Sequence, residues 1–237
     1  SQLSLGKKVG CGLDSNNTIQ CWGQAIHPSY NAPNAPFTQF DLSQHNGCAI
    51  SPIGEIECWG DNDSGQASPS TDEYIQISVG WDHACALNIT ENIHCWGRNH
   101  QSQAPILQIG NYTLVTAGYE HTCAIKTDQT AECWGSNDIG QSDVPNGVNF
   151  IDISAGYYHT CGITTSGSIL CWGADFDNQS NPSTATPLPA TGNTWSEVSS
   201  GRSHTCAIGL NGDVSCWGDN TYSQATEPAG LHLAVSS

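Results

Sequence analysis

Residues 85–97 read Cys-Ala-Leu-Asn-Ile-Thr-Glu-Asn-Ile-His-Cys-Trp-Gly, and this Cys-x9-Cys-Trp-Gly unit occurs six times in the 237-residue chain. The first cysteines of successive units lie 37 to 45 residues apart, and all twelve cysteines fall within the units. A fixed period of this length is typical of repeat proteins. The six pairs are Cys11 and Cys21, Cys48 and Cys58, Cys85 and Cys95, Cys123 and Cys133, Cys161 and Cys171, and Cys206 and Cys216.

Each unit predicts a β-hairpin closed by a disulfide. Short apolar stretches flank a turn, and two copies carry the strong turn signals Ser166-Gly167 and Asn211-Gly212. Cysteines that face each other across antiparallel strands have Cα atoms about 4.5–5.5 Å apart, which a disulfide can span. Zinc is the alternative, but zinc sites usually need more closely spaced cysteine pairs. We therefore expect one disulfide within each repeat and no metal.

Each repeat divides into four expected strands. A first strand leads into a glycine-containing first turn, two cysteine strands follow, and an Asn-x3-Gln turn then leads into a short edge strand. No stretch has sustained helical periodicity. We therefore expect an all-β fold, a six-bladed β-propeller that forms a single domain over residues 1–237. The expected first strands are Ser1–Leu5, Phe37–Leu42, Tyr74–Val79, Leu114–Thr116, Phe150–Ser154 and Trp195–Ser199.

Two motifs resemble those of a known family. Residues 118–125 read Gly-x-x-His-x-Cys-Ala-Ile and residues 133–141 read Cys-Trp-Gly-x-Asn-x-x-Gly-Gln. Both resemble the regulator of chromosome condensation repeat, and the resemblance covers nearly the whole chain. It implies a β-propeller. Nuclear members have seven blades and promote nucleotide exchange on a small GTPase, whereas the cysteine pairs of this chain are more similar to the extracellular branch in Crinkly-type plant receptor kinases. A secreted bacterial β-lactamase inhibitor has a similar propeller, which gives a binding role precedent in this fold.

Composition restricts the compartment and the partners. The chain has five Lys and Arg residues and 22 Asp and Glu residues, which give a net charge of −17. This charge disfavours nucleic acid and anionic membranes as partners. Paired cysteines at this density indicate an oxidising compartment, and no apolar run is long enough to insert in a membrane. We expect a secreted, extracellular glycoprotein. The Asn-x-Ser/Thr sequons are at Asn16, Asn62, Asn88, Asn111 and Asn178.

The chain lacks the motifs of common enzymes. No Gly-x-Ser-x-Gly, His-Glu-x-x-His or phosphate-binding loop occurs, and no cysteine is left over as a nucleophile. Residues 61–65 resemble part of a calcium loop but coincide with an Asn-x3-Gln turn. We expect no enzymatic activity and no cofactor. The Trp of each Cys-Trp-Gly and the recurring histidines are interpreted as packing between repeats; these histidines are His83, His121, His159 and His204.

The first turns carry the candidate binding residues. A constant Gly and His flank two variable residues, and the residue types Trp, Tyr and Arg dominate the energetics of many protein interfaces. The alternative is that these rings cap the ends of the blades. The candidates are Trp81, Asp82, Tyr119, Glu120, Tyr157, Tyr158 and Arg202.

The expected function is an extracellular protein-interaction or assembly module. A lectin is the first alternative, because repeated aromatic turns suit the stacking of sugars, and a secreted protein inhibitor is the second. Residues 231–237 resemble a seventh first strand. That strand is expected to close the ring of blades, to begin a further repeat of a longer chain, or to pair with a neighbouring copy. The last alternative would give an oligomer or filament.

Overall fold

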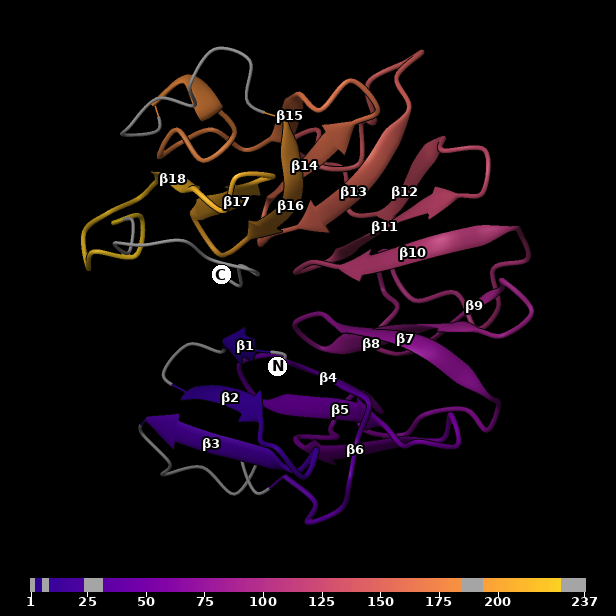
Figure 1. The fold of residues 1–237 in the computed structure, drawn as a ribbon. Coiled ribbons are helices and arrows are strands. Elements are labelled where there is room, and N and C mark those ends of the chain that lie inside the picture. Colours follow the sequence, from indigo (N-terminus) through magenta and orange to yellow (C-terminus); the bar gives the residue numbers. More distant parts are fainter. Residues whose placement is uncertain (1–2, 6–8, 24–31, 185–193, 227–237) are drawn as a thin grey trace.

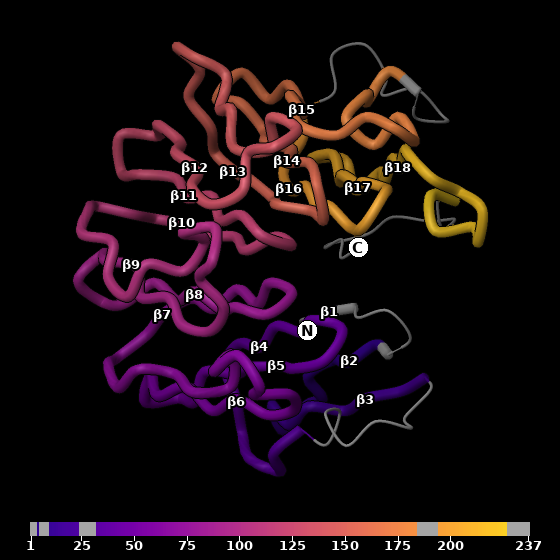
Figure 2. The backbone as a smooth tube through the Cα atoms, turned by 180° about the vertical axis from the view of Figure 1, so that it is seen from behind, coloured from indigo at the N-terminus to yellow at the C-terminus, as the bar shows by residue number. Residues whose placement is uncertain are grey.

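The computed structural model describes residues 3–5, 9–23, 32–184 and 194–226, and these residues form six antiparallel sheets of three strands each. The sheets follow one another in chain order around a common centre, as opposite views show (Figures 1 and 2). The six-bladed, all-β propeller is confirmed. The inner strands are β1 (Leu3–Leu5), β4 (Gln39–Leu42), β7 (Tyr74–Val79), β10 (Tyr112–Ala117), β13 (Phe150–Ala155) and β16 (Trp195–Ser200).

The cysteines lie on the other two strands of each sheet. The middle strands are β2 (Val9–Leu13), β5 (Asn46–Ile50), β8 (His83–Asn88), β11 (His121–Lys126), β14 (His159–Thr164) and β17 (His204–Gly209). The outer strands are β3 (Ile19–Gly23), β6 (Ile56–Gly60), β9 (Ile93–Gly97), β12 (Ala131–Gly135), β15 (Ile169–Gly173) and β18 (Val214–Gly218). One short 3-10 helix, η2 (Pro182–Thr184), follows the fifth sheet.

The expectation of a fourth strand in each repeat is wrong for the described residues. The segments after the Asn-x3-Gln turns contribute only single bridges, between Ile93 and Gln108 and between Thr130 and Asn149. These connections contain prolines such as Pro105 and Pro145, which have no N–H group to donate to a strand ladder. The expected strand at residues 231–237 lies outside the described residues.

One disulfide joins the middle and outer strands of each sheet. Cys123 of β11 lies directly opposite Cys133 of β12, and their Cα atoms are 4.1 Å apart. The Cα separations of the six pairs are all 4.0–4.1 Å, and no cysteine is free. Each of the six predicted pairings is confirmed.

The hydrophobic core lies between neighbouring sheets. Ile77 and Val79 of β7 pack in one cluster with Ile50 of the preceding sheet, and burial of each such side chain stabilises the fold by about 1.5–3 kcal/mol. The middle strands are covered on both faces, so all six residues of β8 are buried. This double burial explains why the middle strands carry small residues such as Ala84 and Ala86 rather than alternating with polar ones.

Polar side chains of the inner strands bind the backbone of the next blade. The Asp41 carboxylate accepts the N–H of Val79 at 2.7 Å, and burial raises the pKa of Asp41 despite this and other hydrogen bonds. Hydroxyl groups of the inner strands accept backbone N–H groups of the next blade in the same way, at 2.9–3.1 Å. The accepting hydroxyl and the donating residue are Ser4 and Leu42, Ser78 and Ala117, Thr116 and Ala155, and Ser154 and Ser200. The small polar residues of these strands therefore hold neighbouring blades in register.

Candidate interaction surface

Backbone hydrogen bonds place the first turns of successive blades side by side. The N–H of Trp81 donates to the carbonyl of Gly118 at 3.3 Å, and the N–H of Tyr119 donates to the carbonyl of Gly156 at 3.3 Å. The N–H of Tyr157 continues the series to Gly201 at 3.1 Å. A Cβ atom on Gly118 would lie 2.4 Å from the Gly156 carbonyl oxygen, so the turn-to-turn contact requires glycine.

The side chains of these turns meet in one aromatic cluster, formed by His45, Trp81, Tyr119, Tyr157 and Tyr158. The rings of Tyr119 and Tyr157 stack with centroids 3.9 Å apart. The Trp81 ring lies edge-on to both, at 5.2 and 5.6 Å, and Tyr158 packs edge-on against Tyr157 at 4.5 Å. The rings come from four successive blades, and all of them keep part of their surface exposed. The structure therefore brings four of the predicted binding residues into mutual contact.

A fifth predicted residue, Arg202, lies against this cluster. Its guanidinium carbon is 5.3 Å from the centroid of the Tyr157 ring, a cation–π geometry. Burial, with smaller contributions from Tyr119 and Tyr158, raises the pKa of the Tyr157 hydroxyl. The Tyr157 hydroxyl is therefore held more firmly in its neutral form than an exposed tyrosine.

Asp82 and Glu120, also predicted as binding residues, engage a charged network beside the cluster. Asp82 Oδ2 lies 3.2 Å from Arg98 Nη1, and Glu120 Oε1 lies 3.1 Å from His100 Nε2. Arg98 Nε donates to His100 Nδ1 at 2.9 Å, so the four side chains form one chain of contacts. This network connects the Asn-x3-Gln turn that contains His100 with the first turns that contain Asp82 and Glu120. Each of the two carboxylates therefore already has a partner within the chain.

His45 belongs to the cluster although the sequence analysis did not select it. Its ring lies edge-on to Trp81, with centroids 5.4 Å apart. The position of His45 in the repeat could have indicated this, because residues 43–46 precede Cys48 as the first-turn residues 80–83 precede Cys85. Ser43 and Asn46 replace the usual Gly and His at that turn, which hid the equivalence.

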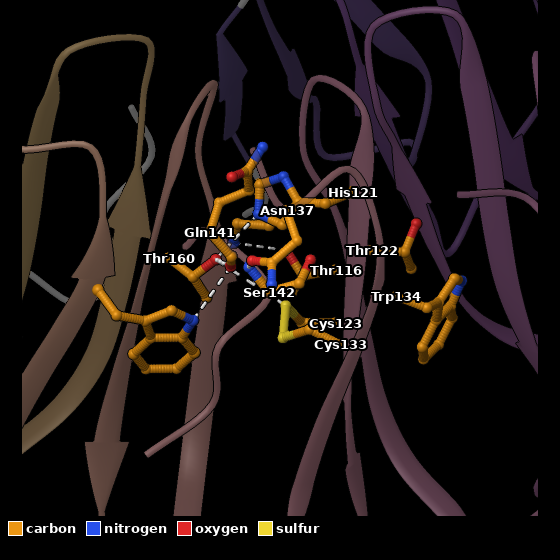
Figure 3. Close-up of a disulfide and its surroundings, with 12 residues drawn as sticks. Thr116, His121, Thr122, Cys123, Cys133, Trp134, Asn137, Gln141, Ser142 and Thr160 are labelled. Carbon is orange, nitrogen blue, oxygen red and sulfur yellow. Dashed lines mark hydrogen bonds between the residues drawn. A yellow bond between two sulfur atoms is a disulfide. The ribbon is translucent and has the colours of Figure 1, made fainter. Parts of the chain in front are cut away.

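A repeated polar junction lies between the blades next to these turns. His121 Nε2 is 2.9 Å from Thr160 Oγ1 of the next blade, and Thr160 Oγ1 donates to the Gln141 carbonyl at 2.9 Å (Figure 3). The equivalent contacts join His83 to Thr122 and His159 to Thr205. The interpretation of the recurring histidines as packing between repeats is confirmed for His83, His121 and His159. Burial lowers the pKa of His83 to about 4 and those of His121 and His159 to about 3.

The Trp side chains complete the same junctions. Each of four indole N–H groups donates to the glutamine carbonyl of the preceding Asn-x3-Gln turn at 2.9–3.0 Å: Trp96 to Gln66, Trp134 to Gln103, Trp172 to Gln141 and Trp217 to Gln179. Trp59 is buried as well. Trp22 is the exception: its side chain is 52% exposed in the first blade, so the expected burial between repeats is wrong for this residue.

Four of the five sequons have an exposed asparagine: Asn16, Asn62, Asn111 and Asn178. Asn88 is only 3% exposed. Its amide donates to Asp72 at 2.7 Å, and its Oδ1 accepts the backbone N–H groups of Thr90 and Asn92. Asn88 therefore differs from the other four sequons, because its side chain is held in a buried, hydrogen-bonded turn, and glycosylation at all five positions stays a prediction.

The calcium-like stretch at residues 61–65 forms a hydrogen-bonded turn. Asn62 Oδ1 accepts the N–H of Ala67 at 2.9 Å, and Gln66 Oε1 accepts the N–H of Ser64 at 2.8 Å. Among the described residues, no group of three or more His, Cys, Asp or Glu side chains could hold a metal ion. In the described part of the chain, no helix has the length and apolar character needed to cross a membrane.

Comparison with known sequences identifies the repeat. The pattern of regulator of chromosome condensation (RCC1) repeats matches residues 74–103, 112–141, 150–179 and 195–224, which together make up just over half of the chain. The chain belongs to the RCC1 repeat family. The matched residues are the third to sixth blades of this RCC1 propeller. No curated protein matches this sequence.

Solved structures share the fold of this RCC1 propeller over its full length. The ectodomain of the receptor kinase CR4 from Physcomitrella patens superposes with a TM-score of 0.82 at 23% identity, over 100% of this chain and 68% of that one. The ectodomain of ACR4 from Arabidopsis thaliana gives 0.82 at 24% identity, over 100% and 88%. Prp20p from Saccharomyces cerevisiae gives 0.75 at 17% identity, over 91% and 71%. The resemblance to Crinkly-type ectodomains is confirmed for the fold.

Proposed function

We propose that this RCC1 propeller is an extracellular, non-enzymatic recognition module that binds a protein partner through its aromatic cluster. The observation that carries the proposal is the meeting of Trp81, Tyr119, Tyr157 and Tyr158 on one end of the propeller. Tyrosine and tryptophan supply large contact areas at a small cost in side-chain entropy, and they are enriched among the residues that dominate binding energy.

Six disulfides and four exposed sequons support an extracellular location. The CR4 and ACR4 structures are receptor ectodomains with the same fold, which agrees with this location. Secretion of the free chain and N-glycosylation are parts of the proposal. A protein inhibitor would use the same surface. Self-assembly through residues 231–237 would use a different one.

Carbohydrate binding is the second candidate. It would use the outward face of Tyr158, whose side chain is 39% exposed. Tyr119 and Tyr157 stack on each other at 3.9 Å, so each ring covers one face of the other and leaves less surface for a sugar. A protein partner fits this self-packed cluster better, because an irregular protein surface can contact ring edges as well as ring faces.

A paired array experiment tests the proposal. The purified chain is applied to an array of extracellular proteins and to a glycan array, together with the variants Tyr158→Ala and Trp81→Ala. We expect protein ligands whose binding is lost in both variants while the melting temperature changes little. The matched control is Tyr222→Ala, because Tyr222 is an exposed ring, 87% accessible, on an Asn-x3-Gln turn outside the cluster.

The other outcomes have defined meanings. Glycan ligands that depend on Tyr158 would favour the lectin. Protein binding that survives both variants would overturn the proposed surface. A large fall in melting temperature with retained binding would show that the rings only cap the blades.

A further inference from the structure

We propose that the partner of the aromatic cluster presents a basic segment, and that a Lys or Arg side chain of that segment lies against the exposed rings. This inference rests on the proposed function and adds the chemistry of the partner. Three features of the described residues support this inference. The Arg202 guanidinium already lies against the rings, exposed carboxylates lie at the same end of the propeller, and the charge of Arg98 is largely neutralised by Asp82.

The cluster already holds a cation in the required geometry. The guanidinium of Arg202 lies 5.3 Å from the centroid of Tyr157, and Arg202 is exposed. The electron-rich faces of Tyr and Trp rings attract guanidinium and ammonium groups at such distances. The arrangement within the chain therefore shows how a partner's cation can bind, either beside Arg202 or in its place.

Exposed carboxylates lie at the same end of the propeller as the cluster. In an antiparallel blade the first turn and the Asn-x3-Gln turn lie at the same end, so the acidic residues of both turns share this surface. Exposed carboxylates on the Asn-x3-Gln turns are Asp63, Asp138, Asp175 and Asp177. Their combined field, on a chain with a net charge of −17, attracts a basic partner and accelerates its association.

The described basic groups at this end do little to offset the described carboxylates. Arg98 is paired with Asp82 at 3.2 Å, so its charge is largely neutralised. Among the described residues at this end, Arg202 is the one permanent cation without a carboxylate within 4 Å. In the described part of this surface, an acidic ligand would find one exposed guanidinium without a paired carboxylate, whereas a basic ligand would find aromatic faces and several carboxylates.

A direct binding assay tests the inference. Hexa-arginine, hexa-glutamate and a Gly-Ser peptide of equal length are titrated into the intact chain by isothermal titration calorimetry at low and high salt. We expect hexa-arginine to bind, more weakly at high salt, and the other two peptides not to bind. Tyr158→Ala and Trp81→Leu should each weaken hexa-arginine binding about two- to fivefold, the range of an exposed cation–π contact.

The direction in which Arg202→Gln changes the affinity for hexa-arginine is the decisive observation. The substitution removes a like charge and frees the Tyr157 ring, so hexa-arginine should bind more tightly, by about two- to fivefold. Tyr222→Ala is the control and should leave the affinity unchanged. Thermal melting of each variant verifies that it is folded.

Three results would overturn the inference. The first is absence of hexa-arginine binding to the intact chain. The second is binding that does not respond to Tyr158→Ala or Trp81→Leu, because charge elsewhere would then explain it. The third is preferential binding of hexa-glutamate that Arg202→Gln abolishes, which would make the partner acidic. In each case the proposed function would still stand if the array ligands depend on Tyr158, and it would fail separately if they do not.

Discussion

The Nε2 atom of His121 lies 2.9 Å from the Oγ1 atom of Thr160 on the next blade. The Thr160 hydroxyl donates its hydrogen bond to the Gln141 carbonyl, so Thr160 Oγ1 must accept a hydrogen bond from the Nε2–H group of His121. His121 is therefore the neutral tautomer protonated at Nε2. Its Nδ1 atom is buried without a hydrogen-bond partner. The junction is thus one hydrogen bond short, and this feature recurs at His83 and His159.

Thr160→Val should destabilise the propeller. The substitution keeps the shape of the side chain but removes its hydroxyl, which leaves the buried Nε2–H of His121 and the Gln141 carbonyl each without one partner. Unmade hydrogen bonds of buried groups cost about 1–3 kcal/mol. The free energy of unfolding, measured by urea denaturation with the disulfides intact, should fall by about this amount. Thr160→Ser retains the hydroxyl and should be much milder; equal effects of the two variants would contradict this account.

Stability should fall in mild acid because of the three buried histidines. Their pKa is about 6.5 in the unfolded chain, while burial lowers it to about 4 for His83 and about 3 for His121 and His159. Below pH 6.5 the unfolded chain therefore binds protons that the folded chain does not. The free energy of unfolding should be at its plateau above pH 6.5 and decline toward pH 4, by at most about 1.4 kcal/mol per pH unit for each histidine.

The chain supplies the control for this acid sensitivity. At the junction between the second and third blades, Asn46 occupies the histidine position and Ala84 the threonine position. The double variant His121→Asn with Thr160→Ala copies that junction and removes one titrating group. Its unfolding free energy should depend less steeply on pH between 6.5 and 4. An unchanged slope would assign the acid sensitivity to other groups, such as the carboxylates whose pKa is lowered, for example Asp72 and Asp219.

The sequons should differ in occupancy. Glycopeptide mapping of the folded protein, produced in a secretory host, should find glycans at some or all of Asn16, Asn62, Asn111 and Asn178. It should find none at Asn88, because the Asn88 amide donates to Asp72 at 2.7 Å in a buried turn. A glycan at Asn88 in a folded, monomeric fraction would refute this prediction.

The same turn can be tested by mutation. Asn88→Ala should lower the free energy of unfolding by about 1–3 kcal/mol, because the N–H groups of Thr90 and Asn92 lose their acceptor. Asn111→Ala removes an exposed sequon and should change stability little. Similar losses in the two variants would show that Asn88 has no special role in the turn.

The spatial arrangement of the candidate binding residues could be predicted only in part, and the reason is physical. Trp81, Tyr119 and Tyr157 occupy equivalent positions in successive repeats, so the repeat alone indicated that they share one end of the propeller. The sequence could not separate Asp82 and Glu120 from them, because their pairing with Arg98 and His100 depends on the distance between turns. His45 was missed because its turn lacks the usual glycine and histidine.

The amino-acid sequence by itself determined the six repeats, the three strands that carry or flank the cysteines, and the pairing of all twelve cysteines. These features are local: the partners of each disulfide are ten residues apart, and alternation along a hairpin decides which residues face each other. Only the tertiary structure decided that rings from four blades touch, that Asn88 is buried and that Trp22 is exposed. Those outcomes depend on how blades pack against each other, and that packing is set by contacts such as Trp81 N–H to Gly118 that join residues almost 40 positions apart.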